Sequence, residues 1–193
     1  MDAMDQFSKP LKTEETKLGI KFTLNPRRRA EKAGRELLVT YDERWPMVEG
    51  FECKYSYFVR FLKAGNVAGK HYHESKHEIM VPIMGKFEFK LEDIETKETD
   101  QFELDAADNQ AFYVRARVSH SVQSIEEGGV MLVLASSPNS NGDEYPYEMK
   151  YRDMPDHSSH SPADCRQSIY WPDNNEKRLD QDRYQKVWFQ HRT

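Results

Sequence analysis

The sequence has few of the features that mark secreted, membrane or nucleic-acid-binding proteins. Its 193 residues include only two cysteines, Cys53 and Cys165, which lie too far apart to form a metal-type pair, and we expect both to be free thiols. No apolar run approaches the roughly 18 residues of a membrane span, and the first residues have no apolar core of a secretion signal. The net charge of -5 argues against nucleic-acid binding, which requires a basic surface. These absences predict a cytoplasmic protein with neither a membrane nor a nucleic-acid partner.

Short apolar segments dominate what the sequence does contain. Aromatic residues make up 12% of the chain, including ten Tyr and ten Phe, and they favour strands over helices. KYSYFVRFL (54–62) alternates between two faces, and segments such as EIMVPI, KFEFKLE, AFYV and GVMLVLAS follow at intervals of about ten residues. This spacing is typical of an all-β sandwich or barrel in one domain. Pro82 falls within a predicted strand, which we therefore expect to be an edge strand or to be bulged.

We expect three parts along the chain. Residues 1–18 are predicted to form a mobile or loosely docked N-terminal arm, residues 19–149 the β-barrel, and residues 150–193 a polar C-terminal extension. The extension carries aromatic residues near its end, Trp188 and Phe189. We expect it to fold over the domain or over a neighbouring subunit.

The stretch HYHESKHE (71–78) holds three of the seven histidines and two glutamates. His71 and His73 are two apart, so on a strand their side chains leave the same face. The residues that follow are predicted to turn, after which Glu78 begins the next strand and can point back at both imidazoles. His120, from a distant strand, could supply a third imidazole. Three histidines and one carboxylate suit a divalent first-row metal and leave coordination positions open for a ligand.

Glycines around this stretch add a specific resemblance. Gly65, His71, His73, Glu78 and Gly85 stand at every fixed position of the first cupin motif, so the chain is identified as a member of the cupin superfamily. Gly65 would permit the turn into the histidine strand and Gly85 the hairpin after the glutamate strand. The resemblance implies a small jelly-roll barrel, which agrees with the strand pattern.

The second cupin motif is matched less well. His120 falls where that motif has its histidine, and the resemblance therefore implies it as the fourth metal ligand. The positions where Gly, Pro, Gly and Asn are usual hold other residues: Asn109, Arg115, Arg117 and Ser124. We expect the turn before His120 to differ from that of the family.

Two further similarities narrow the family and together cover roughly residues 50–150. GKHYHESKHEIMVPIMGKFEF resembles the C-terminal epimerase domain of capsular-polysaccharide reductase-epimerases, whose G-x-H-x-H-x-x-K-x-E pattern is matched from Gly69 through Lys76 to Glu78. The segment from DNQAFYV to EYPYEM resembles the second half of dTDP-sugar 3,4-ketoisomerases. Those enzymes work without metal and have glutamine where this chain has Glu78, and arginine where it has Ala68. Glu78 therefore favours the metal-binding branch.

These resemblances imply an isomerase or epimerase of surface-polysaccharide biosynthesis that acts on a keto-sugar or nucleotide-sugar. It would move a proton next to a carbonyl and use a divalent metal such as Zn, Mn or Fe. Tyr72 and Tyr113 are candidate donors to the enediolate oxygen, and Tyr57 and Tyr113 are candidates for handling the proton. The resemblance also implies a homodimer.

Three arginines are candidate ligands of a substrate diphosphate: Arg60, Arg115 and Arg117. An arginine fork suits phosphate, but solvated barrel residues are an equal alternative. Two other functions stay open at this point. One is an Fe(II)-dependent dioxygenase with the same ligand set, and the other is a sugar-binding cupin without catalysis.

Overall fold

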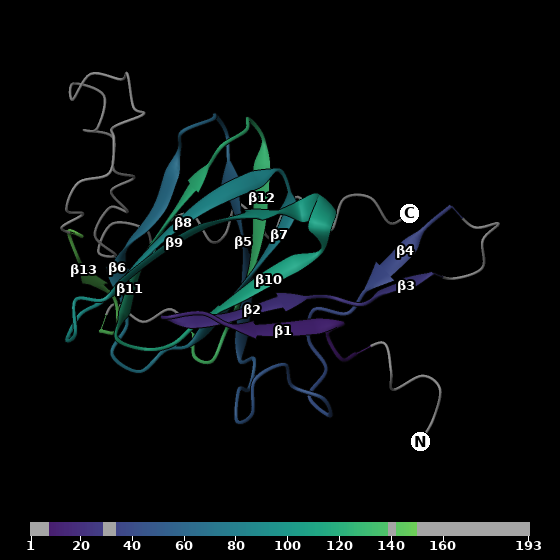
Figure 1. The fold of residues 1–193 in the computed structure, drawn as a ribbon, viewed down its shortest axis with the longest axis horizontal. Helices are drawn as coiled ribbons and strands as arrows, with labels where there is room; N and C mark the ends of the chain where they lie inside the picture. Colours follow the sequence, from purple (N-terminus) through teal and green to yellow (C-terminus); the bar gives the residue numbers. More distant parts are fainter. Residues whose placement is uncertain (1–7, 29–33, 139–141, 150–193) are drawn as a thin grey trace, which may run out of the picture. The chain divides into compact units, whose positions relative to one another are not determined.

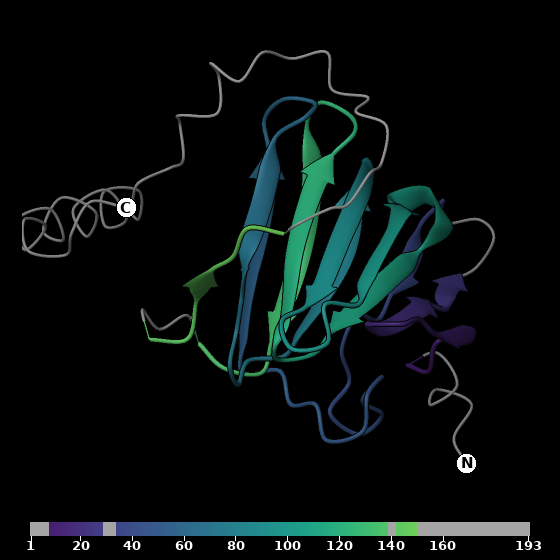
Figure 2. The ribbon, with the colours of Figure 1, turned by 60° about the vertical axis from the view of Figure 1, so that its left-hand side comes forward.

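The computed structural model describes residues 8–28, 34–138 and 142–149, and in these ranges the chain is almost entirely antiparallel β-structure. One sheet has six strands in the order β1-β2-β10-β7-β12-β5, a second has five in the order β13-β6-β11-β8-β9, and β3 pairs with β4. Figure 1 labels the strands, and Figure 2 follows the larger sheet from blue β5 through green β12 toward the purple N-terminal strands. The strands are β1 (Lys12–Glu15), β2 (Gly19–Thr23), β3 (Pro26–Arg28), β4 (Glu36–Leu38), β5 (Tyr55–Phe61), β6 (Val67–Tyr72), β7 (Glu78–Met84), β8 (Lys86–Asp93), β9 (Thr99–Asp105), β10 (Gln110–Val114), β11 (Val118–Ser124), β12 (Gly129–Ala135) and β13 (Tyr145–Pro146).

The two sheets enclose the main hydrophobic core. Met80, Phe112 and Val133 from the larger sheet pack against Phe89 and Val122 from the smaller one. Because successive side chains of a strand leave opposite faces, the other face of the larger sheet forms a separate cluster. The all-β architecture predicted from the strand spacing is confirmed, and so is the jelly roll implied by the cupin resemblance.

The outer cluster covers the larger sheet on the side away from the main core. Phe22, Ile79 and Leu134 of the sheet pack there with Phe51 from the segment before β5. This cluster makes β10 and β7 buried on both faces. A residue on those strands can therefore be buried without facing the inside of the barrel, which matters for the placement of the predicted site residues.

The N-terminal boundary differs from the expected one. β1 pairs with β2 over Lys12–Glu15, and Leu18 is completely buried in the main core. Residues 12–18 therefore belong to the barrel and not to a loosely docked arm. Burial of the Leu18 side chain stabilises their attachment to the core. The chain divides into units of residues 1–150 and 151–193. The predicted C-terminal extension, residues 150–193, lies entirely outside the described residues.

Backbone conformation shows how residues other than glycine occupy the glycine positions of the second cupin motif. Gly65 and Gly85 have positive φ of 79° and 88°, and Asn109 and Arg117 adopt the same left-handed region at 53° and 64°. The turn before His120 thus keeps the conformation that glycine would favour, although we expected it to differ. Pro82 lies in a central strand and faces an irregularity in β12, so the bulged alternative is the one observed. Within the described ranges no helix is long and apolar enough to cross a membrane.

Candidate active site

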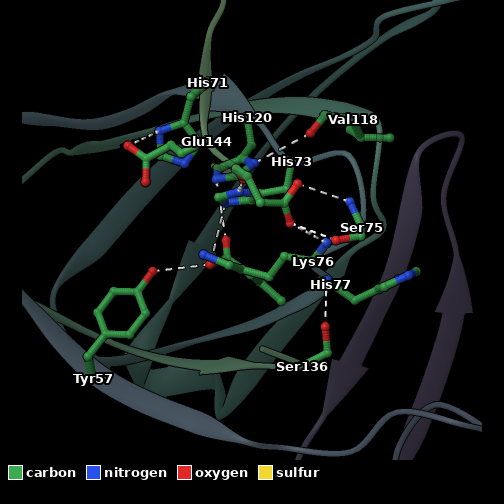
Figure 3. A network of polar contacts seen from close by, with 12 residues as sticks. Tyr57, His71, His73, Ser75, Lys76, His77, Val118, His120, Ser136 and Glu144 are labelled. Atoms are coloured by element: carbon green, nitrogen blue, oxygen red, sulfur yellow. Dashed lines mark hydrogen bonds and ion pairs between the residues drawn. The ribbon is translucent and has the colours of Figure 1, made fainter. Parts of the chain in front are cut away.

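Three histidines and one glutamate meet between the two sheets, and Figure 3 shows the three histidines next to one another. His71 and His73 come from β6 and the residue after it, His120 from β11, and Glu78 from the start of β7. One ring nitrogen of each histidine lies within 4.8 Å of the others. Nε2 of His120 is 3.4 Å from Oε2 of Glu78, and Nε2 of His73 is 3.7 Å from Oε1. The structure therefore brings together all four predicted ligands.

Close approach of two backbones places the histidines next to each other. His71 pairs with His120 across β6 and β11, and the register shifts just beyond this pair. Gly69 has a φ of 87°, and a Cβ built on it would lie 2.5 Å from the carbonyl oxygen of His120. Only glycine fits this position, since any side chain would push β6 away from β11.

The turn between His73 and Glu78 is held by a carboxylate from far along the chain. Oδ1 of Asp143 accepts hydrogen bonds from the backbone N–H of Glu74 at 2.7 Å and of Ser75 at 3.2 Å. Oδ2 accepts from the Ser75 hydroxyl at 2.9 Å and from the backbone N–H of Lys76 at 3.0 Å. These bonds stabilise the ionised carboxyl and hold the pKa of Asp143 below its usual value, even though burial raises it.

Burial keeps two of the histidines neutral at pH 7. Desolvation, together with the neighbouring His120, lowers the pKa of His71 to about 4. Desolvation, together with His73, lowers the pKa of His120 to about 3. A neutral imidazole has one ring nitrogen with a free lone pair, so these residues can bind a metal or accept a proton.

Two buried atoms at the centre provide the test of whether a metal would fit. Nε2 of His73 and Oε2 of Glu78 have no hydrogen-bond partner among the described residues. Unpartnered buried polar atoms are costly, and a cation between them would remove that cost. Three imidazole nitrogens and a carboxylate are the donors that Zn, Mn or Fe prefers. These four residues could therefore hold a divalent metal.

Of the predicted tyrosines, only Tyr57 reaches this site. Its hydroxyl donates a hydrogen bond to Oε1 of Glu78 at 3.1 Å. Burial, followed by the negative charge of Glu78, raises the pKa of Tyr57 well above its usual value. The phenol is therefore protonated at neutral pH and acts as a hydrogen-bond donor that holds its proton tightly.

Tyr72 and Tyr113 leave the opposite faces of their sheets. Tyr72 lies between two inward-facing histidines, so its side chain points outward, where its ring stacks on Tyr145 with centroids 5.2 Å apart. Tyr113 belongs to the outer cluster, and its hydroxyl is 2.6 Å from Nδ1 of His77. The expectation that these two tyrosines act at the site is not supported, because strand alternation turns both away from it.

The structure does not bring the three predicted arginines to the histidines. Arg60 is exposed on the outer face of β5, whereas Arg115 pairs with Asp93 at 2.9 Å. Arg117 pairs with Glu74 at 2.5 Å and with Glu95 at 2.6 Å, and its backbone N–H donates to the carbonyl of His73. Arg117 therefore supports the turn after His73, because both ends of its guanidinium already bind carboxylates.

Comparison with known proteins shows which family the chain belongs to. The family model described as "FdtA: WxcM-like, C-terminal" matches residues 27–155. The chain belongs to this family. No curated protein sequence matches the WxcM-like chain.

Solved structures with the same fold include sugar-converting enzymes of low sequence identity. The TDP-quinovose 3,4-ketoisomerase of Campylobacter jejuni is 17% identical, with a TM-score of 0.58 over 68% of this chain and 94% of its own. A 4-keto-6-deoxy sugar epimerase of Streptomyces spheroides is 15% identical, with a TM-score of 0.58 over 70% and 72%. A mutant 3,4-ketoisomerase of Thermoanaerobacterium thermosaccharolyticum, in complex with TDP-4-keto-6-deoxyglucose, is 20% identical, with a TM-score of 0.57 over 68% and 89%. At these identities the comparisons establish a shared fold.

Three residues at the site of the WxcM-like chain were missed in the sequence. Lys76 was placed in a turn, yet it is only 2% exposed, and Figure 3 shows its side chain extending into the histidine cluster. Asp143 and Glu144 approach from beyond β12. The signals were present, since Lys76 occupies the lysine of the G-x-H-x-H-x-x-K-x-E pattern and the other two lie in the acidic, tyrosine-containing segment.

Proposed function

We propose that the WxcM-like chain is an isomerase or epimerase that moves a proton next to the carbonyl of a nucleotide-linked keto-sugar. The observation that carries this proposal is the cluster of three histidines, in which burial keeps His71 and His120 neutral, beside the protonated hydroxyl of Tyr57. The structural neighbour bound to TDP-4-keto-6-deoxyglucose supports the substrate class. Family membership supports the reaction class.

The chain's residues divide the chemistry between a donor and an acceptor. Removing a proton next to a carbonyl needs a base and a donor that stabilises the oxygen as negative charge develops. Tyr57 keeps its proton at neutral pH, and its hydroxyl suits the hydrogen-bond donor once it turns from Glu78 to the substrate oxygen. His71 has the most accessible imidazole of the three, with its side chain 19% exposed, and it suits the base in a metal-free site. If His71 binds a metal, its only lone pair is used and another group must take the proton.

We further propose that the site binds a divalent metal through His71, His73, His120 and Glu78. Such an ion would polarise the substrate oxygen. The support lies in the donor set and in the two unpartnered atoms, Nε2 of His73 and Oε2 of Glu78. Assembly into a homodimer, a cytoplasmic location and a role in polysaccharide biosynthesis stay predictions from the sequence.

The test is hydrogen exchange on a keto-sugar, combined with elemental analysis of untagged protein purified without added metal. In D2O, TDP-4-keto-6-deoxyglucose is expected to acquire deuterium at the carbon next to its carbonyl, at a rate proportional to protein concentration. Near-stoichiometric zinc or manganese is expected in the active preparation. Iron with oxygen consumption and no exchange would instead support a dioxygenase, and sugar binding without exchange would support a non-catalytic cupin.

A further inference from the structure

Residues 142–149 form a strap that is fastened to the histidine strand from outside. β13 pairs with β6, placing Tyr145 opposite Tyr72, and the two rings stack. The backbone N–H of Tyr147 donates to the carbonyl of Lys70 at 2.8 Å, and its hydroxyl donates to Glu92 at 2.5 Å. The strap is therefore attached by backbone, aromatic and hydroxyl contacts on the outer side of β6.

Two consecutive residues of this strap reach His71 in β6 and His73 just after it. The backbone carbonyl of Asp143 accepts a hydrogen bond from Nδ1 of His73. Oε1 of Glu144 lies 3.4 Å from Nδ1 of His71, and Figure 3 shows Glu144 beside that ring. In each ring the contacted nitrogen is Nδ1, which leaves Nε2 for the inside of the cluster.

These contacts determine where each neutral ring carries its proton. A neutral imidazole has one N–H and one lone pair, and the partner of one nitrogen sets the state of the other. A carbonyl and a carboxylate only accept, so they favour the proton on Nδ1. Nδ1 of His120 likewise lies 3.4 Å from the carbonyl oxygen of Val118. The Nε2 atoms of His71 and His73 then present lone pairs, whereas Nε2 of His120 also faces an acceptor, Oε2 of Glu78 at 3.4 Å.

We propose that Asp143 and Glu144 are positioning residues that act through His73 and His71, holding both rings in the Nδ1–H form so that their Nε2 lone pairs converge. Asp143 does so with its carbonyl, while its carboxylate anchors the turn after His73. The catalytic consequence rests on the proposed function, but the effect on the rings does not. It applies equally to a metal site and to a metal-free histidine base.

The test uses 15N-histidine-labelled, full-length protein freed of metal by chelation, because the nitrogen chemical shifts distinguish the two neutral forms. Spectra of wild type at pH 7.5 are expected to show His71 and His73 protonated on Nδ1. Glu144→Ala should convert His71 to a mixture of forms without changing His73, whereas Glu144→Gln should preserve the wild-type form because its amide oxygen still accepts. Glu148→Ala, an exposed acidic residue on the same strap, is the matched control and should change neither ring.

The same variants separate positioning from general loss of structure. Glu144→Ala should lower kcat by about 10- to 100-fold with KM changed less than about twofold, and Glu144→Gln should recover most of the loss. Asp143→Asn, which cannot accept all four hydrogen bonds, should release His73 from its single form. Circular dichroism and thermal unfolding check the fold of each variant.

Two outcomes would overturn the positioning role: an Nε2–H form of His71 in wild type, or an unchanged His71 in Glu144→Ala. An unchanged His73 in Asp143→Asn would overturn the part assigned to the Asp143 carboxylate. If the rings behave as expected but wild type exchanges no sugar proton, the proposed function fails and the positioning role stands.

Discussion

Tyr57 and Tyr113 make similar contacts with neighbouring residues of the HYHESKHE stretch, yet in different parts of the molecule. The Tyr57 hydroxyl donates to Glu78 between the sheets, whereas the Tyr113 hydroxyl lies against His77 in the outer cluster. His77 and Glu78 are consecutive, so the strand sends them to opposite sides of the larger sheet.

Surroundings, more than the contact itself, decide what each pair can do. The inner pair adjoins three histidines and two unpartnered buried atoms. In the outer pair Tyr113 packs edge-on against Phe51, and Tyr113 and His77 partner each other. We therefore assign chemistry to the inner pair and a packing role to the outer one.

The largest expected effect separates Glu78 from His77. Glu78→Gln keeps the shape of the side chain but removes its charge, so bound metal should fall from near stoichiometric to near zero and exchange activity by at least about 100-fold. His77→Gln should leave both within about twofold of wild type. Elemental analysis and the exchange assay measure the two effects, and metal retained in full by Glu78→Gln would remove this residue from the ligand set.

The two tyrosines provide the next comparison. Tyr57→Phe removes the hydroxyl that would stabilise the substrate oxygen, and it is expected to lower kcat by about 100-fold, as is usual when one such hydrogen-bond donor is lost. Tyr113→Phe should change kcat by less than about twofold. It should lower the free energy of unfolding by about 1 kcal/mol, because the hydrogen bond to His77 is lost. Steady-state kinetics and urea unfolding measure these effects, and equal losses of activity in both variants would contradict the division between inner and outer pairs.

A third prediction concerns the close approach that builds the inner site. Gly69→Ala combines a left-handed backbone with a clash against His120, and should lower the unfolding free energy by about 3 kcal/mol. Gly128 has a similar φ of 77° but open space around it, so Gly128→Ala should cost only about 1 kcal/mol. Denaturant titration of both variants isolates the cost of the clash, and equal costs would show that β6 can move away from β11 freely.

The smallest effect lies at Asp93, on the outside of the barrel. Burial raises the pKa of this carboxyl, but hydrogen bonds from the N–H groups of Thr96 and Glu95 and the charge of Arg115 bring it below its usual value. A lowered folded pKa contributes stability above the unfolded value, and this stability is lost as pH falls. Asp93→Asn should therefore cost about 1.5 kcal/mol at pH 7, and the difference from wild type should shrink as pH falls below about 3.9.

Unfolding curves of this variant at several pH values, with the exchange assay at pH 7, check the Asp93 prediction. Activity should stay within about twofold of wild type, because the structure places Asp93 and Arg115 away from the histidines. A raised KM for the nucleotide-sugar in Arg115→Ala would instead return this arginine to the substrate site.

Much of the fold and the centre of the site could be predicted from local sequence. Strand spacing indicated the all-β barrel, and the motif glycines indicated which histidines would meet. The same alternation that groups His71 with His73 also turns Tyr72 outward. Strand alternation alone therefore argues against Tyr72 as a donor at the site. Tyr113 was different, because both faces of β10 are buried and its pattern does not say which of them lines the barrel.

The sequence by itself determined the period of each strand and the chemical types brought to the barrel, because side-chain alternation is a property of the local backbone. Only the tertiary structure decided which face is the inside, and that Asp143 and Glu144 reach His73 and His71. Those contacts depend on the register between strands far apart in the chain. That register is set by packing of the two sheets and by the space left at Gly69.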